Sequence, residues 1–468
     1  MSFNPLRIAE LTDAEQSALN DNLEQLEAKM PRNMLRAHLY DGKHAIRHLG
    51  SLIPPAYYQT AVVLGWPAKA VDLLARRCNV DGFVWADGDI DGLGVRELVR
   101  ENKLRAELNQ AFISSLLHST AFLVATTGGQ GEPAGLVHAR DALSATGVWS
   151  SRRRALTSAL TVGEFDKESP ARPVAFTLYL DGVTVTCVKD GQRWSVDRSS
   201  HGFGVPVEPL PYKSRLGRPF GMSRISRPVI SAYRQAVKTA IRMEGGADVF
   251  TWPQMILLGA DSDVFKNADG SMKPDWQVAL GRVFALPDDE DATNPRASVQ
   301  RFEGASPEPH LKMLKQQAEL FAGETSIPIT SLGVSTDGNP TSAESYLASR
   351  EDLVAEAEGA TDDWSGPINR TVTRALAMRS GLRSVPPEWL SIEAKFRSPM
   401  YTSRAAAADA GSKQIGAVPW LADTEVGLEL LGLDEQQIER AMSERRRANG
   451  MKLAEMLTTG NLPNDNAG

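Results

Sequence analysis

Helical spacing of apolar residues dominates the first part of the chain. A capping-box sequence, T-D-A-E, opens a charged amphipathic helix that we expect over 12–30. A second helical pattern covers 55–78. Pro67 is expected to break or restart this helix, because proline has no backbone N–H to donate and its ring clashes with the preceding turn. A third helix is predicted over 93–123, ending in the apolar run A-F-L-V.

Apolar and polar residues then alternate over 123–215, as they do in half-buried strands. β-branched residues are frequent there, and the Asp-Gly pairs beginning at Asp181 and Asp190 are typical of tight turns. The pattern predicts an antiparallel sheet region. Cys187 falls on the same strand face as two valines, which predicts a buried core position.

Helical spacing returns after a Gly- and Pro-rich connector. A helix is predicted from Ser226 to about Phe250, with Pro228 in its first turn, and a second from Glu308 to about Phe321. The first of these helices carries a basic stripe: Arg227, Arg234, Lys238 and Arg242. Between the two helices the pattern is broken, with P-Q-M-I-L-L-G and R-V-F-A-L-P as short strands and an acidic loop from Asp288 to Asp291.

The C-terminal third is mainly helical. A long helix is predicted over 342–380, kinked or divided at Gly366-Pro367. An irregular stretch follows over 382–400, and then an Ala-rich helical region over 405–457 in which Asp423 is expected to cap a helix. The whole pattern predicts a mixed α+β protein with two or three packed regions.

Composition narrows the range of functions. The 58 acidic residues exceed the 51 basic ones, giving a net charge of −7, which argues against a protein that coats nucleic acid by bulk attraction. Contact with DNA would then be local, or would come from enclosing it. The two cysteines cannot form a disulfide framework and suit a reducing cytoplasm. Without a signal-like or spanning apolar run, we expect a soluble protein with no membrane partner.

Catalytic and ligand-binding motifs are scarce. No ligand spacing, P-loop or nucleophile elbow occurs, so we expect no metal, no cofactor and no catalytic residues. The segment 87–92 begins like a calcium-binding loop, but the twelfth position is Leu98 where a bidentate carboxylate is required, which favours a solvated turn. The basic stripe is most simply the solvated face of an amphipathic helix. The residues alone therefore indicate a soluble, mixed protein that is not an enzyme.

The order of the segments carries a resemblance. Residues 221–233 open a helix that leads into an apolar stretch, and 309–322 form a second helix. The most specific match is a short I-P-x-x-x-L-G within 325–333, followed by S-A-E at 342–344, which opens a long helix. Over roughly 40–460 the chain resembles tailed-bacteriophage portal proteins of the siphophage type, and is most similar to those of phages infecting actinobacteria.

The resemblance implies a portal fold assembled as a ring, with wing, stem, clip and crown regions. Residues 1–221 would be the wing, 222–250 and 307–325 the paired stem helices, and 251–306 the clip between them. Residues 326–341 would hold the tunnel loop, 342–398 the long wing helix and its return, and 399–468 the crown and C-terminal tail.

The implied function is a head–tail connector: a ring of twelve subunits at one capsid vertex through which double-stranded DNA is packaged and ejected. The implied partners are the large terminase subunit, the head–tail adaptor, and the major capsid and scaffolding proteins. The protein would be assembled in the host cytoplasm and end in the virion.

Three groups of residues are the candidates for this function. The tunnel loop, expected to face the DNA, contributes Ser335, Thr336, Asp337, Gly338 and Asn339. The stem offers four cations as candidates for the lumen: Lys312, Lys315, Arg234 and Lys238. The clip offers an acidic docking loop: Asp288, Asp289, Glu290 and Asp291.

Two alternatives remain from the sequence. The first is a minor capsid or head–tail adaptor protein, although such proteins are usually shorter and lack paired stem helices around a clip. The second is an uncharacterised hydrolase that uses dispersed carboxylates, which would require a concave site with perturbed acidic groups.

Overall fold

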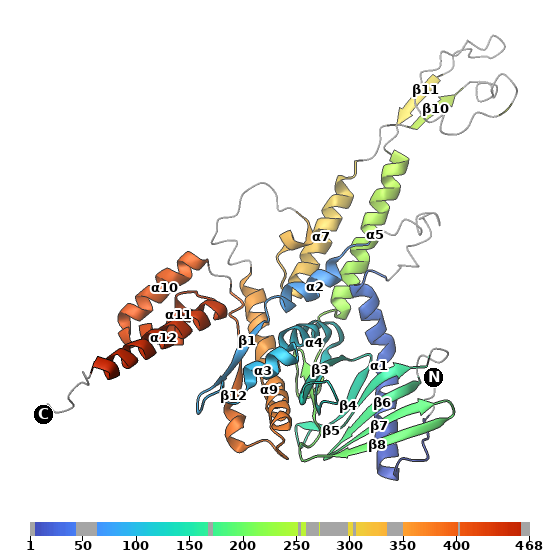
Figure 1. The fold of residues 1–468 in the computed structure, drawn as a ribbon. Coiled ribbons are helices and arrows are strands. Elements are labelled where there is room, and N and C mark those ends of the chain that lie inside the picture. Colours follow the sequence, from blue (N-terminus) through green and yellow to red (C-terminus); the bar gives the residue numbers. More distant parts are fainter. Residues whose placement is uncertain are drawn as a thin grey trace, which may run out of the picture. The chain divides into compact units, whose positions relative to one another are not determined.

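The computed structural model contains helices and antiparallel sheets together, which confirms the mixed α+β class (Figure 1). The residues it describes are 5–43, 63–166, 172–250, 254–258, Ser271, 298–302, 306–334, 350–400 and 403–459. They fall into two compact units: Met1–Asn79 with Phe83–Ala394, and Val80–Gly82 with Lys395–Gly468.

The first unit contains the main helices: α1 (Asp13–Tyr40), α2 (Trp66–Ala75), α3 (Val95–Glu101), α4 (Leu104–His118), α5 (Arg227–Phe250), α7 (Glu308–Thr325) and α9 (Glu351–Arg379). It also holds the short 3-10 helices η3 (Ile329–Leu332) and η4 (Pro387–Ser391). The capping box predicted at the start of α1 is confirmed, because the Thr12 hydroxyl accepts from the Glu15 amide and the Glu15 carboxylate accepts from the Thr12 amide.

The largest sheet has five antiparallel strands in sequence order: β4 (Ala145–Ser150), β5 (Ala155–Phe165), β6 (Pro173–Leu180), β7 (Val183–Asp190) and β8 (Arg193–Ser200). Leucines of α1 pack with Leu160, Leu178 and Val185 of this sheet to form one core. Cys187 is fully buried in the same core, which confirms the predicted core position.

A second sheet has three antiparallel strands in the order β3-β2-β9: β3 (Gly135–Asp141), β2 (Thr120–Thr127) and β9 (Val207–Pro211). Helices α4 and α9 pack against β2, and Phe112 of α4 stacks on Trp364 of α9 with ring centroids 4.4 Å apart. These two helices therefore hold the second sheet in the core of the unit.

Helices α5 and α7 pack side by side, and the antiparallel strands β10 (Gln254–Leu258) and β11 (Ser298–Phe302) pair between them in the sequence (Figure 1). The boundaries of α5 confirm the prediction from Ser226 to about Phe250, and β10 confirms the strand predicted in P-Q-M-I-L-L-G. Helix α7 extends four residues beyond the expected end at Phe321. The strand predicted in R-V-F-A-L-P lies outside the described residues.

The second unit is mainly helical, as predicted. Its elements are α10 (Arg404–Ala417), η5 (Pro419–Asp423), α11 (Glu425–Leu430) and α12 (Glu435–Thr459). The cap of α11 is Thr424, whose hydroxyl accepts from the Gly427 amide at 3.1 Å, so the expectation of Asp423 was wrong by one residue. Asp423 instead forms an ion pair with Arg445 at 2.8 Å.

Three boundaries differ from the pattern-based predictions. Helix α1 continues through Pro31 to Tyr40, because Leu39 and Asn33 are buried and hold the second half against the core. The helix predicted over 93–123 is wrong: it is divided into α3 and α4, and its apolar end is strand β2. Lys103 and Ser119 adopt left-handed φ angles of 49° and 88°, which end the helical path at those points.

The C-terminal region gives two further differences. The stretch over 382–400 is not irregular throughout, since it contains η4 and the strand β12 (Ile392–Phe396), which pairs with β1 (Val80–Trp85). Pro367 does not divide α9, which is one helix over its described length. The expected start of that helix, 342–349, lies outside the described residues.

Candidate functional site

The paired helices α5 and α7 contact each other through their apolar faces. On α5 the buried residues include Val229, Tyr233 and Val237, which recur every four positions. On α7 they include Ala318 and Phe321. One polar contact joins the helices, because the Gln317 amide donates to the Thr239 hydroxyl at 3.1 Å within the buried interface. The pair is therefore held in one register.

The outer surface of α7 combines a polar face with apolar flanks. Lys312 lies nine residues from buried Phe321, which places it on about the opposite side of the helix. Leu311 is 50% exposed, Met313 40% and Leu320 56%. Leu311 and Leu320 lie on opposite sides of the helix, and both are exposed in the single chain.

The four cations predicted to line a lumen all lie on this helix pair. The Lys312 ammonium is exposed and pairs with Glu308, one turn earlier, at 2.8 Å. Lys315 is half-buried on the same helix. On α5, Arg234 is exposed and Lys238 is half-buried, on the face away from the buried stripe.

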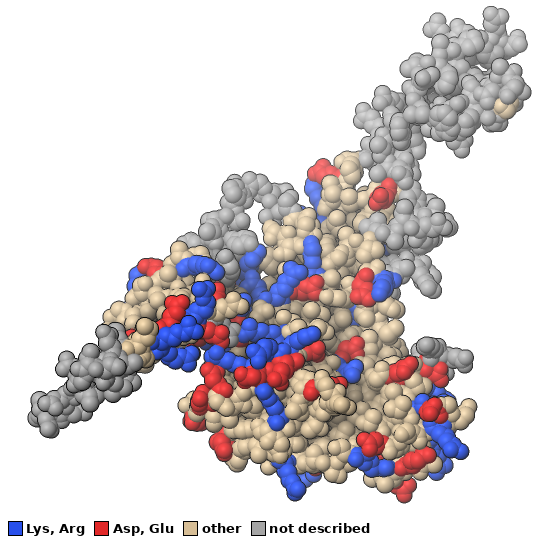
Figure 2. Space-filling view, in the orientation of Figure 1, with Lys and Arg blue, Asp and Glu red and all other residues tan. Residues whose placement is uncertain are grey.

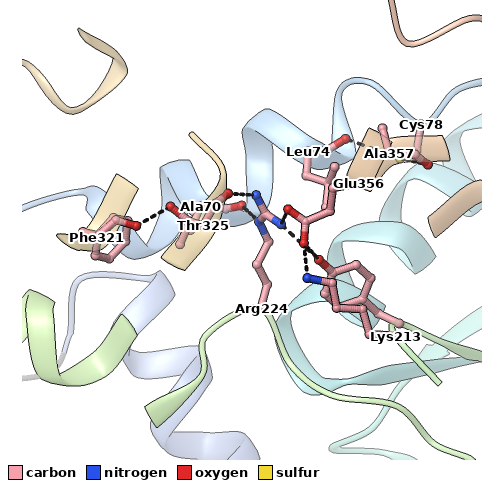
Figure 3. Close-up of polar contacts among 10 residues, drawn as sticks. Ala70, Leu74, Cys78, Lys213, Arg224, Phe321, Thr325, Glu356 and Ala357 are labelled. Carbon is pink, nitrogen blue, oxygen red and sulfur yellow. Dashed lines mark hydrogen bonds and ion pairs between the residues drawn. The ribbon is translucent and has the colours of Figure 1, made fainter. Parts of the chain in front are cut away.

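A buried guanidinium connects the base of this pair to the rest of the unit (Figure 3). Arg224, in the segment before α5, is 5% exposed. Its nitrogens donate to the backbone carbonyls of Ala70 in α2 and Thr325 at the end of α7. One of them also pairs with the Glu356 carboxylate of α9 at 2.8 Å. One side chain therefore fixes three helices that are far apart in the sequence.

The Glu356 carboxylate is the acceptor at the centre of this cluster. Arg224, the Lys213 ammonium and the Tyr212 hydroxyl all contact it, and Arg224 also donates to the Tyr212 hydroxyl at 3.0 Å. Burial alone would raise the pKa of Glu356, but the Arg224 charge and the three donors outweigh burial and lower this pKa to about 2. We call these four residues the junction.

Through Arg224, the junction contacts the chain on both sides of the segment that joins α7 to α9. Ser326 takes a left-handed φ of 52° directly after Thr325, turning the chain out of α7. The following turn η3 is tied to α2, because the Trp66 indole donates to the Leu332 carbonyl at 3.2 Å and Lys69 donates to the Ser331 carbonyl at 2.6 Å. Arg224 binds Thr325 before this segment and Glu356 after it.

Two predicted groups cannot be placed. The tunnel loop residues from Ser335 to Asn339 and the acidic clip residues from Asp288 to Asp291 lie outside the described residues. Of the tunnel loop region, 326–334 is described, and of the clip only β10, β11, Ser271 and Ser306.

The junction was missed by sequence reasoning. Arg224 stands within the 221–233 segment that carried part of the resemblance, but nothing in its local pattern separates it from the exposed arginines of the basic stripe. Glu356 sits among several acidic residues on the same helix. The only local signal is that Glu356 falls between the buried Leu353 and Ala357.

Charges on the visible surface are mixed in sign. Figure 2 shows Lys and Arg side chains interspersed with Asp and Glu over the face in view. Among the described residues, no helix is long and apolar enough to cross a membrane, and no group of three or more His, Cys, Asp or Glu side chains could hold a metal ion. The segment 87–92 forms a turn in which Asp91 pairs with Arg96 at 2.6 Å.

The chain is similar to known proteins over most of its length. The sequence model of a family described as "Phage portal protein, SPP1 Gp6-like" matches residues 21–451. The portal protein of Mycobacterium phage L5 is 25% identical over 385 residues, covering 81% of this chain and 77% of that protein. The portal protein of Mycobacterium phage D29 is 24% identical over the same shares.

Solved structures to which the chain is similar include necks of gene transfer agent particles. One, from an empty particle computed with C6 symmetry, has a TM-score of 0.41 at 17% identity and covers 79% of this chain and 90% of that chain. Another, from a native particle computed with C12 symmetry, has a TM-score of 0.39 at 15% identity and covers 85% and 98%.

Proposed function

Because the chain belongs to the SPP1 Gp6-like family of phage portal proteins, we propose that its copies close into a ring of about twelve around a bore that passes double-stranded DNA. Membership confirms the resemblance read from the order of the segments, and with it a structural role in the virion. The ring, its partners and the roles of its parts are proposals.

The observation that carries the ring is the apolar surface of α7. Met313 and Leu320 are seven residues apart and share one side of the helix, whereas Leu311 lies about 180° from Leu320. All three are at least 40% exposed in the single chain. In a ring each subunit has a neighbour on both sides, so two apolar flanks on one helix are what a heterologous, closing interface needs.

The remaining face of α7 would form the wall of the bore. It carries Lys312, with Lys315 beside it, and Glu308 moderates the charge of Lys312 through their ion pair. A conduit must touch phosphates without holding them, since each retained contact adds affinity and slows sliding. A chain of net charge −7 gives a ring whose overall field repels DNA, so a few stem cations would supply only local attraction.

The domain assignments remain part of the proposal. Residues 222–250 and 307–325 would be the stem, 251–306 the clip, 326–341 the tunnel loop region and 399–468 the crown. Trp66 and Lys69 anchor 331–332, and Arg224 binds Thr325 just before the region, which supports a loop that is held firmly at its base. We propose that Ser335 to Asn339, which include no Lys or Arg, line the narrowest part of the bore.

The clip would dock the large terminase subunit during packaging and the head–tail adaptor afterwards, while the outer ring contacts capsid and scaffolding proteins. Charge reversal of the acidic residues from Asp288 to Asp291 should weaken terminase docking and leave ring assembly intact. Unchanged terminase docking in a pull-down with the purified rings would contradict the assignment of these acidic residues to docking.

Disulfide cross-linking tests the ring directly. In the double variant Leu311→Cys/Met313→Cys, the two thiols lie on opposite flanks of α7 at nearly the same height along the helix. Mild oxidation should therefore join neighbouring α7 helices and give a ladder of covalent oligomers on a non-reducing gel. The native Cys78 and Cys187 are both fully buried and do not interfere. Lys312→Cys, on the bore face, is the matched control and should give no ladder. A monomer that yields no ladder in the double variant would overturn the proposal.

A further inference from the structure

A second group of cations converges far from the stem, beside the second half of α1. A cavity of about 290 Å³ opens there between α1, the end of α4, strand β4 and the turn before Gly221. Four cations line it: Lys29, Arg32, Arg36 and Arg218. None of the lining residues, all of which the structure describes, is acidic. We call this cavity the basic pocket.

The cations of the basic pocket have neutral neighbours. The Lys29 ammonium lies 4.5 Å from the centre of the Phe220 ring and 2.7 Å from the side-chain amide of Gln25. The Arg36 guanidinium donates to the backbone carbonyl of His118 at 3.2 Å. A ring face, an amide and a carbonyl orient a cation, but they do not cancel its charge.

The electrostatics agree with this geometry. Burial, with a smaller contribution from the nearby Arg32, lowers the pKa of Lys29 to about 8 and that of Arg36 to about 10. Asp141 is the acid that acts on His118, but its carboxylate accepts from the amides of Leu143 and Ser144 and from the Ser144 hydroxyl. Positive charge therefore accumulates in the basic pocket without an internal counter-charge.

Two buried polar atoms at the basic pocket also lack a partner in the described part of the chain. His118 is 4% exposed and Thr146 3%, and both line the cavity. Neither the His118 Nδ1 nor the Thr146 Oγ1 has a hydrogen-bond partner. Buried polar groups in folded proteins are almost always satisfied, so atoms of this kind indicate a ligand or solvent that completes them.

We propose that the basic pocket binds an oxyanion of the phosphate type, held by Lys29 and Arg36 and reached past Arg32 and Arg218. A tetrahedral oxyanion offers several acceptor oxygens and more than one negative charge, which matches several converging donors better than a single carboxylate does. The cavity has room for the ion with part of its hydration shell. The exposed Arg32 and Arg218 would also allow the ion to be part of a nucleic-acid backbone.

Isothermal titration of the purified full-length protein tests this site, using inorganic phosphate in a chloride buffer at constant ionic strength. The wild type should bind about one phosphate per chain, and Lys29→Met/Arg36→Met should lose at least about tenfold in affinity. Lys189→Met, which removes an exposed lysine on strand β7, should bind as the wild type does. A second arm with a short DNA duplex separates the two sources of the oxyanion.

Binding of phosphate or of duplex DNA that is lost in the double variant supports the site, and the ligand that binds identifies the source. Binding that the double variant keeps, or no binding in either arm, overturns it. Should the double variant fail to fold, Arg218→Gln at the exposed rim serves instead and should weaken binding about threefold.

Discussion

The junction and the basic pocket both withdraw arginine from solvent within the same unit, but only the junction supplies the opposing charge. Arg224 meets the Glu356 carboxylate and two backbone carbonyls. Arg36 meets a single carbonyl and has other cations as neighbours. A charge that is balanced inside the chain fixes helices to one another. A charge that is left unbalanced attracts an anion from solution, which is why we propose that the basic pocket is a binding site.

The largest effect should come from removing the charge that the junction depends on. Arg224→Met leaves the Glu356 carboxylate buried without its main counter-charge and frees two backbone carbonyls. We expect a loss of about 3–5 kcal/mol in the free energy of unfolding, measured by denaturant titration. The double variant Arg224→Met/Glu356→Gln should recover part of this loss. A single variant as stable as the wild type would show that the junction does not fix the helices.

Removing the acid should cost somewhat less and should change the acid sensitivity. Glu356→Gln keeps a hydrogen-bonding side chain, so we expect a loss of about 2–3 kcal/mol. The folded-state pKa of Glu356 lies near 2, below its ordinary value of 4.5. Its stabilisation is therefore complete above pH 4.5 and declines as the pH falls toward 2. The free energy of unfolding, measured from pH 4.5 down to pH 2, should fall less steeply in Glu356→Gln than in the wild type. Equal slopes would contradict the lowered pKa of Glu356.

The basic pocket should respond in the opposite direction. Lys29→Met removes an unbalanced charge and keeps much of the packing, so stability in phosphate-free buffer should rise by an amount on the order of 1 kcal/mol. Because the folded-state pKa of Lys29 is lowered from 10.5 to about 8, the wild type should gain stability as the pH rises from 8 toward 10.5. Thermal unfolding over this range should show the gain in the wild type and a smaller one in Lys29→Met. A marked destabilisation by Lys29→Met would mean that Lys29 is structural.

An exposed ion pair should give the smallest effect. Lys312 and Glu308 keep 74% and 66% of their side-chain surface exposed. Lys312→Gln should change the free energy of unfolding by no more than about 0.5 kcal/mol, because solvent screens such pairs. The same denaturant titration measures it. If Lys312→Gln lowered the free energy of unfolding nearly as much as Arg224→Met, buried and exposed ion pairs would not differ in the way proposed.

The fold was predictable where the local pattern is sufficient. Helix α5 was expected almost to the residue, because Pro228 in its first turn and a four-residue apolar repeat both mark it. The division between α3, α4 and β2 was not, because it depends on left-handed φ angles at Lys103 and Ser119, residues that give no signal for them. An apolar run such as A-F-L-V suits a buried strand as well as a buried helix.

The candidate site was predictable only in outline. The helix pair and its cations could be read from spacing, but Arg224 and Glu356 meet across more than a hundred positions and only the fold brings them together. The basic pocket combines residues from α1, α4 and the turn at Arg218 in the same way. A single sequence records which charges exist, and leaves open which of them are balanced after folding.

Electron cryomicroscopy of the purified protein tests the central proposal most directly. We expect a closed ring in which Lys312 faces the bore while Leu311 and Leu320 are covered by the two neighbouring subunits. A ring with α7 on its outer surface, or a protein that remains a monomer with those leucines in solvent, would contradict it.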